Sequence, residues 1–263
     1  MKASRKLFLL TPLCALLAAG SAHATNGMLM EGYGPISTGM GGASQAIDHG
    51  NAGMAQNPAT LGMMADGTAR LDVAFGILGP DVSSSMTGMP TAESGGTSYL
   101  MPAFGYTRRN GALTYGLGVF AQGGMGTEYE ANSFLARGSG SPVRSELGVG
   151  NVIFPVAYQV NPNLTGGATL KFMWSSLDLR MAATPAQLGA MVTGGSGNLG
   201  AALLNPVGPL STANWARIDF SDDNDFTGAA KSTGFGAALG MTYKVNKDVV
   251  VGASYQFKSA LND

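Results

Sequence analysis

Seven segments of this chain alternate between apolar and small residues, and this alternation restricts the possible fold more than any other feature of the sequence. In the last segment the apolar positions are Val249, Val251, Ala253, Tyr255 and Phe257. Side chains of a β-strand point alternately to the two faces of its sheet, so the pattern predicts strands with one apolar face. The predicted strands are residues 68–79, 97–108, 111–122, 146–160, 164–178, 230–245 and 248–259.

The opposite faces of these strands indicate what surrounds the sheet. In segment 230–245 the residues between the apolar ones are Gly234, Gly236, Ala238, Gly240 and Thr242. A soluble β-sandwich would instead place Asp, Glu and Lys on its solvent face, yet only 12% of the chain is charged, against ~25% in soluble domains. Each segment also has the ~9–11 residues that a tilted membrane strand needs. The pattern therefore predicts an all-β fold, an antiparallel transmembrane β-barrel.

The connections between the predicted strands differ in length on the two sides of the sheet. Those at 109–110, 161–163 and 246–247 are short and lie in Asn-containing sequences typical of hairpin turns. Those at about 80–96, 123–145 and 179–229 are long. Short turns on one side and long loops on the other are typical of outer-membrane barrels. Arg108 and Arg109 beside the first turn are expected to anchor the barrel at the membrane interface.

The N-terminus has the features of a secretory signal peptide. Lys2, Arg5 and Lys6 precede an apolar stretch, and Ala22-His23-Ala24 forms a small-x-small cleavage site. Beyond residue 24 no apolar run reaches the ~18 residues of a transmembrane helix. The only Cys lies inside the predicted signal peptide, so the remaining chain has no thiol for a nucleophile, a disulfide or a zinc site.

Residues 25–67 form a region of a different kind. They are rich in Gly and Met and show no strand period. Small residues and adaptable methionines suit a compact plug packed inside a lumen. A flexible N-terminal tail is the alternative interpretation.

At this point the sequence resembles a known family. Gly34–Ala43, followed by Asn57-Pro58-Ala59, is similar to the N-terminal hatch of the FadL/TodX-type transporters of long-chain fatty acids and hydrocarbons. The segment Gly252–Lys258 resembles a strand near the middle of such proteins, and the third long loop resembles their partly helical outer loop. The hatch motif that the resemblance transfers to this chain is Gly39, Gly41, Gly42, Asn57, Pro58 and Ala59.

The resemblance implies a monomeric barrel of fourteen strands, plugged by its N-terminal hatch. Hydrophobic ligands would be captured by outer loops, enter an apolar interior and leave sideways through a gap in the wall. Asn57 is expected to cap a turn and Pro58 to fix the backbone, so the motif would organise the hatch and leave ligand binding to other residues.

The resemblance divides the chain into a signal peptide at 1–24, a hatch at 25–67 and barrel strands at 68–263. Seven antiparallel strands cannot close on themselves, and an open edge in lipid leaves backbone groups unsatisfied. The chain is therefore expected to be the first half of a longer barrel. A half-barrel that pairs with another chain is the alternative.

Apolar residues of the outer loops are the candidates for ligand binding, because a barrel wall does not account for them. They are Phe134 and Leu135 in the second long loop, and Leu188, Met191, Leu199, Leu203, Leu204 and Trp215 in the third. Packing of the loops on one another is the alternative explanation.

Residues that could carry catalysis or bind a metal are few. Asp219, Asp222, Asp223 and Asp225 form the main acidic cluster. Within it Asp223-x-Asp225-x-Thr227-Gly228 imitates the opening of a calcium loop, but Gly234 stands where such a loop needs Glu. These carboxylates are therefore expected to be a solvated outer surface. Gly116-x-Gly118-x-x-Ala121 lies within a strand and is not a dinucleotide site. We expect no catalytic residue, no metal and no cofactor.

The sequence thus predicts passive uptake of long-chain fatty acids or hydrocarbons across the outer membrane of a Gram-negative bacterium. The expected partners are these hydrophobic molecules, the outer-membrane lipids and lipopolysaccharide, and the barrel assembly machinery; a nucleic acid is not expected. A general diffusion porin and an outer-membrane lipid hydrolase or acyltransferase are the alternatives. A porin should have a charged constriction and no hatch, and a lipid enzyme should have a Ser/His pair on the barrel wall.

Overall fold

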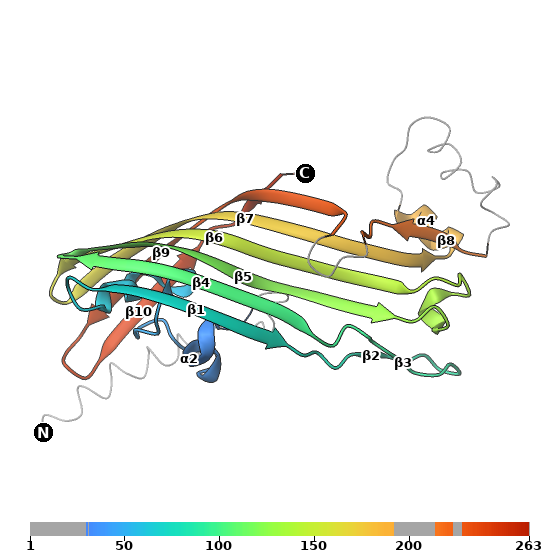
Figure 1. Ribbon diagram of the computed structural model, residues 1–263, viewed down its shortest axis with the longest axis horizontal. Helices are drawn as coiled ribbons and strands as arrows, with labels where there is room; N and C mark the ends of the chain where they lie inside the picture. The colour runs from blue at the N-terminus through green and yellow to red at the C-terminus, as the bar shows by residue number, and fades with distance from the viewer. Residues whose placement is uncertain (1–29, 31, 192–213, 223–227, 263) are drawn as a thin grey trace, which may run out of the picture.

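The computed structural model describes residues 30, 32–191, 214–222 and 228–262. Its main feature is one long antiparallel sheet (Figure 1), in which the strands follow the order β1-β4-β5-β6-β7-β9-β10. These strands are β1 (Ala69–Leu78), β4 (Tyr99–Asn110), β5 (Leu113–Tyr129), β6 (Val143–Asn161), β7 (Leu164–Ala183), β9 (Ala230–Lys244) and β10 (Val250–Gln256). The prediction of seven antiparallel strands is confirmed.

Four further strands are very short, and the alternation did not indicate them. β2 (Ser83–Ser84) and β3 (Ala92–Glu93) pair within the first long loop, β8 (Ala216–Asp219) pairs with the end of β7, and β11 (Ala260–Leu261) pairs with β9. Within the described residues the sheet is open, with β1 at one edge. None of the helices in the described part of the chain is long and apolar enough to cross a membrane.

The apolar face predicted from the alternation is the exposed face of the sheet. Phe75 is 73% exposed and Ile77 is 76% exposed, whereas Thr107 and Thr114 on the other face are fully buried. The exposed apolar side chains include Leu71, Val73, Phe104, Leu113, Tyr115, Phe154, Val156, Phe235, Leu239, Val251 and Tyr255. A continuous apolar surface of this extent suits contact with lipid, not with water.

Strands β5, β6 and β7 are longer than predicted because they continue past this apolar surface into a charged region. There Arg144 lies 2.8 Å from Glu146 and 3.3 Å from Asp178, measured between side-chain N and O atoms. β7 ends at Ala183, so the third long connection begins five residues later than the alternation predicted. In β5 and β6 the opposite face also carries polar residues, Thr127 and Ser145, which weakens the period-two signal, whereas in β7 the alternation continues with Leu177, Leu179 and Met181 and the prediction ended the strand too early.

The short turns are stabilised by asparagines, as their composition predicted. Asn161 Oδ1 accepts hydrogen bonds of 2.9 Å from the amides of Asn163 and Leu164, and Asn246 Oδ1 does the same for Asp248 and Val249. Gly111 follows β4 with a φ of +61°, in the left-handed region that glycine adopts readily.

The buried face of the sheet is covered by the N-terminal region (Figure 1), which contains α2 (Gly34–Gly39), α3 (Gly53–Gln56) and the 3-10 helix η1 (Pro58–Met63). We call residues 30–64 the hatch. Its apolar core joins the sheet through Tyr33, Met54, Ala55, Leu61, Phe120, Ile153 and Ala157. In the structure the described part of this region packs on the wall and does not extend away from it. The predicted signal peptide, residues 1–24, lies outside the described residues.

Candidate functional site

The Asn-Pro-Ala segment attaches the hatch to β9. Asn57 is fully buried, and its Nδ2 donates hydrogen bonds to the carbonyls of Gln45, at 2.6 Å, and Met241, at 3.1 Å. Its Oδ1 accepts a 3.1 Å hydrogen bond from the amide of Ala59 and so caps η1, while Pro58 occupies the first turn of that helix. One amide side chain thus caps a hatch helix and binds the wall.

Glycines of β7 and β9 make room for this contact. A Cβ on Gly167 would lie 2.5 Å from the Ala59 amide nitrogen and 2.7 Å from the Pro58 carbonyl carbon. A Cβ on Gly240 would collide with Asn57 Oδ1 and lie 2.9 Å from Pro58 Cδ. The small residues on the inner face therefore allow the hatch backbone to lie directly on the wall.

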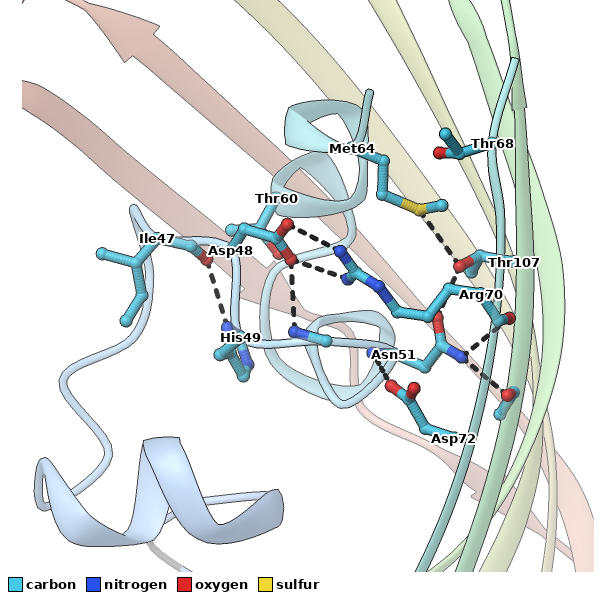
Figure 2. Close-up of polar contacts among 12 residues, drawn as sticks. Ile47, Asp48, His49, Asn51, Thr60, Met64, Thr68, Arg70, Asp72 and Thr107 are labelled. Carbon is cyan, nitrogen blue, oxygen red and sulfur yellow. Dashed lines mark hydrogen bonds and ion pairs between the residues drawn. The ribbon is translucent and has the colours of Figure 1, made fainter. Parts of the chain in front are cut away.

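A second buried asparagine attaches the hatch to the inner face at β1 and β4, near the opposite edge of the sheet from β9 (Figure 2). Asn51 Nδ2 donates to the carbonyls of Gly105, at 2.6 Å, and Arg70, at 3.2 Å. Its Oδ1 accepts from the Thr107 hydroxyl at 2.5 Å, and its backbone amide donates to Asp72 at 2.8 Å. No motif marks Asn51, so only its place in the hatch region could have drawn attention to it.

An ion pair supports the same attachment (Figure 2). Asp48 and Arg70 form two parallel hydrogen bonds of 2.8 Å each, from Nη1 to Oδ1 and from Nη2 to Oδ2. Partial burial by itself would raise the pKa of Asp48. The hydrogen bonds from Arg70 and from the Gly50 amide outweigh burial and hold the pKa of that carboxyl below its usual value.

Arg109 has a different role from the one predicted. Its Nη1 donates to the carbonyl of Met64, at 2.6 Å, and to that of Gly62, and its Nη2 donates to Gln159 Oε1. The prediction of an interfacial anchor is wrong for this residue, because position 109 of β4 is on the inner face, where the end of the hatch supplies carbonyl acceptors.

At its other end the hatch contacts an irregularity in β5. The register of β5 on β6 shifts between Ala121 and Gly123, which leaves Gln122 as an extra residue. The Tyr33 hydroxyl donates a 3.1 Å hydrogen bond to the Gln122 carbonyl, and the Tyr33 ring meets Phe120 edge-on with centroids 6.1 Å apart. Burial raises the pKa of the Tyr33 phenol, so this hydroxyl stays protonated and able to donate.

Beyond this irregularity β4 and β5 separate. Their pairing runs from Asn110↔Leu113 to Ala103↔Phe120 and then ends, although β4 remains paired with β1 and β5 with β6. The next residue of β4 is Pro102, which has no N–H to donate to a ladder. Contact with β5 resumes where the Gly95 amide donates to the Glu128 carbonyl at 2.7 Å. We call this bounded opening, between residues 95–102 and 121–128, the window.

A cavity of about 900 Å³ lies at the window. Its lining is apolar toward the end of the β4–β5 pairing and polar toward the outer loops. The apolar part includes Leu100, Met101, Pro102, Val119, Met125 and Trp174, and the polar part includes Thr127, Glu128, Arg144, Ser145 and Glu146. An apolar cavity at an opening in a lipid-facing wall is suited to the passage of hydrophobic molecules.

The predicted ligand residues that the structure describes lie elsewhere. Phe134 and Leu135 are in the short helix η2 (Phe134–Ala136), Leu188 and Met191 are in α4 (Pro185–Met191), and Trp215 directly precedes β8. Of these residues, Phe134, Leu135, Leu188 and Trp215 do not line the cavity at the window. Leu199, Leu203 and Leu204 lie outside the described residues. The glycines at 123, 124 and 126 were the sequence signal for the window that the prediction did not use.

The structure describes the three motif glycines of the hatch and part of the acidic cluster. Gly39 ends α2, and Gly41 and Gly42 follow it with φ values of +60° and +84°. Asp219 pairs with Arg180 at 3.5 Å and Arg217 at 2.6 Å, whereas Asp223 and Asp225 lie outside the described residues. In the part of the chain that the structure describes, no group of three His, Cys, Asp or Glu side chains could hold a metal ion.

Comparisons with known proteins agree with this architecture. Residues 15–262 match the family described as Outer membrane protein transport protein (OMPP1/FadL/TodX). The structure is similar to the toluene transporter TodX of P. putida, with a TM-score of 0.74 and 32% identity, covering 89% of this chain and 57% of TodX. It is also similar to the toluene transporter TbuX of Ralstonia pickettii, with a TM-score of 0.73 and 36% identity, covering 88% of this chain and 58% of TbuX.

A relative without a described activity is found in Chlorobium limicola. It is an uncharacterized protein in the phosphoenolpyruvate carboxykinase gene 5' region, and it is 40% identical over 113 residues, which are 42% of this chain and 54% of that protein. The chain thus spans little more than half the length of the relatives that it matches.

Proposed function

This chain belongs to the OMPP1/FadL/TodX family of outer membrane transport proteins, and on that premise we propose that it takes part in passive uptake of hydrophobic compounds across the outer membrane. Long-chain fatty acids and hydrocarbons are the proposed substrates. Similarity to TodX and TbuX, both described as toluene transporters, supports the hydrocarbon part of the proposal.

The observation that carries the proposal is the window between β4 and β5. An opening in a wall whose outer face is apolar gives a hydrophobic molecule a path from the lumen into the lipid. The hatch supports the same route, because its asparagines and the wall glycines hold it against the inner face of the sheet, where it would block a direct path along the lumen. A molecule that leaves through the window never has to cross a layer of water.

The proposal includes the finer predictions about location and partners. The signal peptide would be removed after Ala24, the barrel assembly machinery would insert the protein, and the protein would act as a monomer among the lipids and lipopolysaccharide of a Gram-negative outer membrane. Phe134, Leu135, Leu188, Met191 and Trp215 remain predicted outer-loop ligand residues.

Filling the window tests the route. In the full-length protein, Ala121→Trp should lower the rate of toluene and oleate uptake into cells that lack other hydrophobic-compound transporters, because the indole would occupy the apolar part of the cavity. Ala168→Trp is the matched control, since Ala168 is exposed on the outer face of β7 and does not line the cavity. Equal uptake by the two variants, at equal outer-membrane levels, would argue against exit through the window.

A further inference from the structure

The phenol of Tyr99 lies in the window, close to two glycines. A Cβ built on Gly126 of β5 would lie 2.8 Å from Tyr99 Cζ and 3.2 Å from Cε1, and would collide with the hydroxyl oxygen. A Cβ on Gly96 would lie 3.3 Å from Tyr99 Cζ and would also collide with the hydroxyl oxygen. Tyr99 belongs to β4, so its ring reaches across the opening to the backbone of β5.

The two glycines leave room for the ring. Any side chain at position 126 would occupy the space that the Tyr99 phenol fills, and the same holds at position 96. Glycine is unfavourable inside a strand, by about 0.5–1 kcal/mol relative to Ala, so its presence in β5 calls for a local reason such as close approach of another group. The phenol of Tyr99 supplies that reason at Gly126.

Tyr99 divides the window into two unequal parts. Toward the outer loops lie Thr127, Glu128 and the polar end of the cavity. Toward the β4–β5 pairing lies an apolar part, bounded by residues 100–102 on one side and 121–125 on the other. At ~3.4 Å per residue along a strand, this apolar part is on the order of 10 Å long.

From this arrangement we infer that Tyr99 is a specificity-determining residue that limits the cross-section of molecules passing through the window. This inference rests on the proposed function. The apolar part, between the ring and the end of the β4–β5 pairing, admits slender molecules such as unbranched chains and single aromatic rings. The phenol blocks molecules with bulky branching. The barrier is steric, so it depends on the ring and not on the hydroxyl.

Two isomeric alkanes, octane and isooctane, test the inference because they share a formula and differ in cross-section. In cells producing the full-length protein, Tyr99→Ala should raise the ratio of isooctane to octane uptake by about tenfold. Tyr99→Phe should leave the ratio unchanged. Tyr115→Ala, which removes an exposed aromatic from the lipid-facing side of β5, is the control for loss of a tyrosine from the wall.

Gly126→Ala completes the experiment. Its methyl group takes the space of the Tyr99 phenol, so it should change the uptake ratio when Tyr99 is present and have no effect in a Tyr99→Ala background. An unchanged ratio in Tyr99→Ala, or an equal effect of Gly126→Ala in both backgrounds, would overturn the inference while leaving the proposed uptake intact. If the wild-type protein takes up none of the four compounds (octane, isooctane, toluene and oleate), the proposed function itself fails.

Discussion

Two buried asparagines attach the hatch to the inner face of the wall at two separate groups of strands. Asn51 binds carbonyls on β1 and β4, and Asn57 binds a carbonyl on β9. An amide side chain has two donor hydrogens and an acceptor oxygen, so it can join hatch backbone and wall backbone at once. Leaving such a buried group unpaired costs about 1–3 kcal/mol, which disfavours any displacement of the hatch that breaks these contacts.

The ion pair beside Asn51 makes the attachment of the hatch dependent on pH. Because the folded state lowers the pKa of Asp48, the contribution of the pair is fully present above the usual carboxyl pKa of ~3.9 and is lost as the pH falls through the lowered value. The protection of hatch amides against hydrogen exchange, expressed relative to the intrinsic exchange rate at each pH, should therefore fall on acidification through that range.

The variant Asp48→Asn separates this effect from general acid unfolding. It should show faster exchange of the hatch amides already at neutral pH and a smaller further change on acidification. The same acid-induced loss of protection in the variant as in the wild type would contradict a role for the Asp48–Arg70 pair.

At the scale of elements, the strands could be predicted wherever lipid and lumen impose different residues on the two faces. The alternation at Leu71, Val73, Phe75 and Ile77 locates β1, and similar runs locate the six other long strands. The outer ends of β5 and β6 were missed because polar residues such as Thr127 and Ser145 stand opposite the charged face there, whereas the end of β7 keeps its alternation at Leu177, Leu179 and Met181 and could have been predicted.

Two neighbouring glycines of β7 test the idea that the inner face is small so that the hatch can touch it. Gly167→Ala should destabilise the docked hatch by about 1–3 kcal/mol, since its Cβ would lie 2.5 Å from the Ala59 nitrogen. Gly166→Ala is the matched control, because a Cβ there would meet nothing within 4 Å.

Limited proteolysis of the hatch in outer-membrane preparations measures the difference between the two glycine variants. Cleavage should be faster in Gly167→Ala than in wild type, and Gly166→Ala should resemble the wild type. Equal protection in Gly167→Ala and Gly166→Ala would mean that the wall does not need glycine at this contact.

For the whole molecule, the hatch and the window are in direct contact, as the proposed lateral route requires. The same hatch that covers the inner face binds the irregularity of β5 through Tyr33 and Gln122, directly beside the point where β4 and β5 separate. A lateral path into lipid requires both a hatch that covers the inner face and an opening in the wall beside it.

Removing the hatch should therefore convert a selective path into an open one. Deletion of residues 25–67 from the full-length protein, reconstituted in planar bilayers, is expected to raise ion conductance well above that of the intact protein. The intact protein should conduct little and should still take up labelled oleate in a saturable way. Unchanged conductance after the deletion would contradict the assignment of these residues as a plug.

The sequence by itself determined the seven long strands, the apolar side of the sheet and the asparagine turns. Each of these depends on residues close together in the chain, whose side chains alternate or cap locally. Only the tertiary structure decided where β4 and β5 separate, that Asn51 and Arg109 hold the hatch, and that Tyr99 crosses the window. These features depend on the register of strands and on contacts between distant segments, such as Asn57 with Met241, and a local pattern of residue types carries no information about such distances.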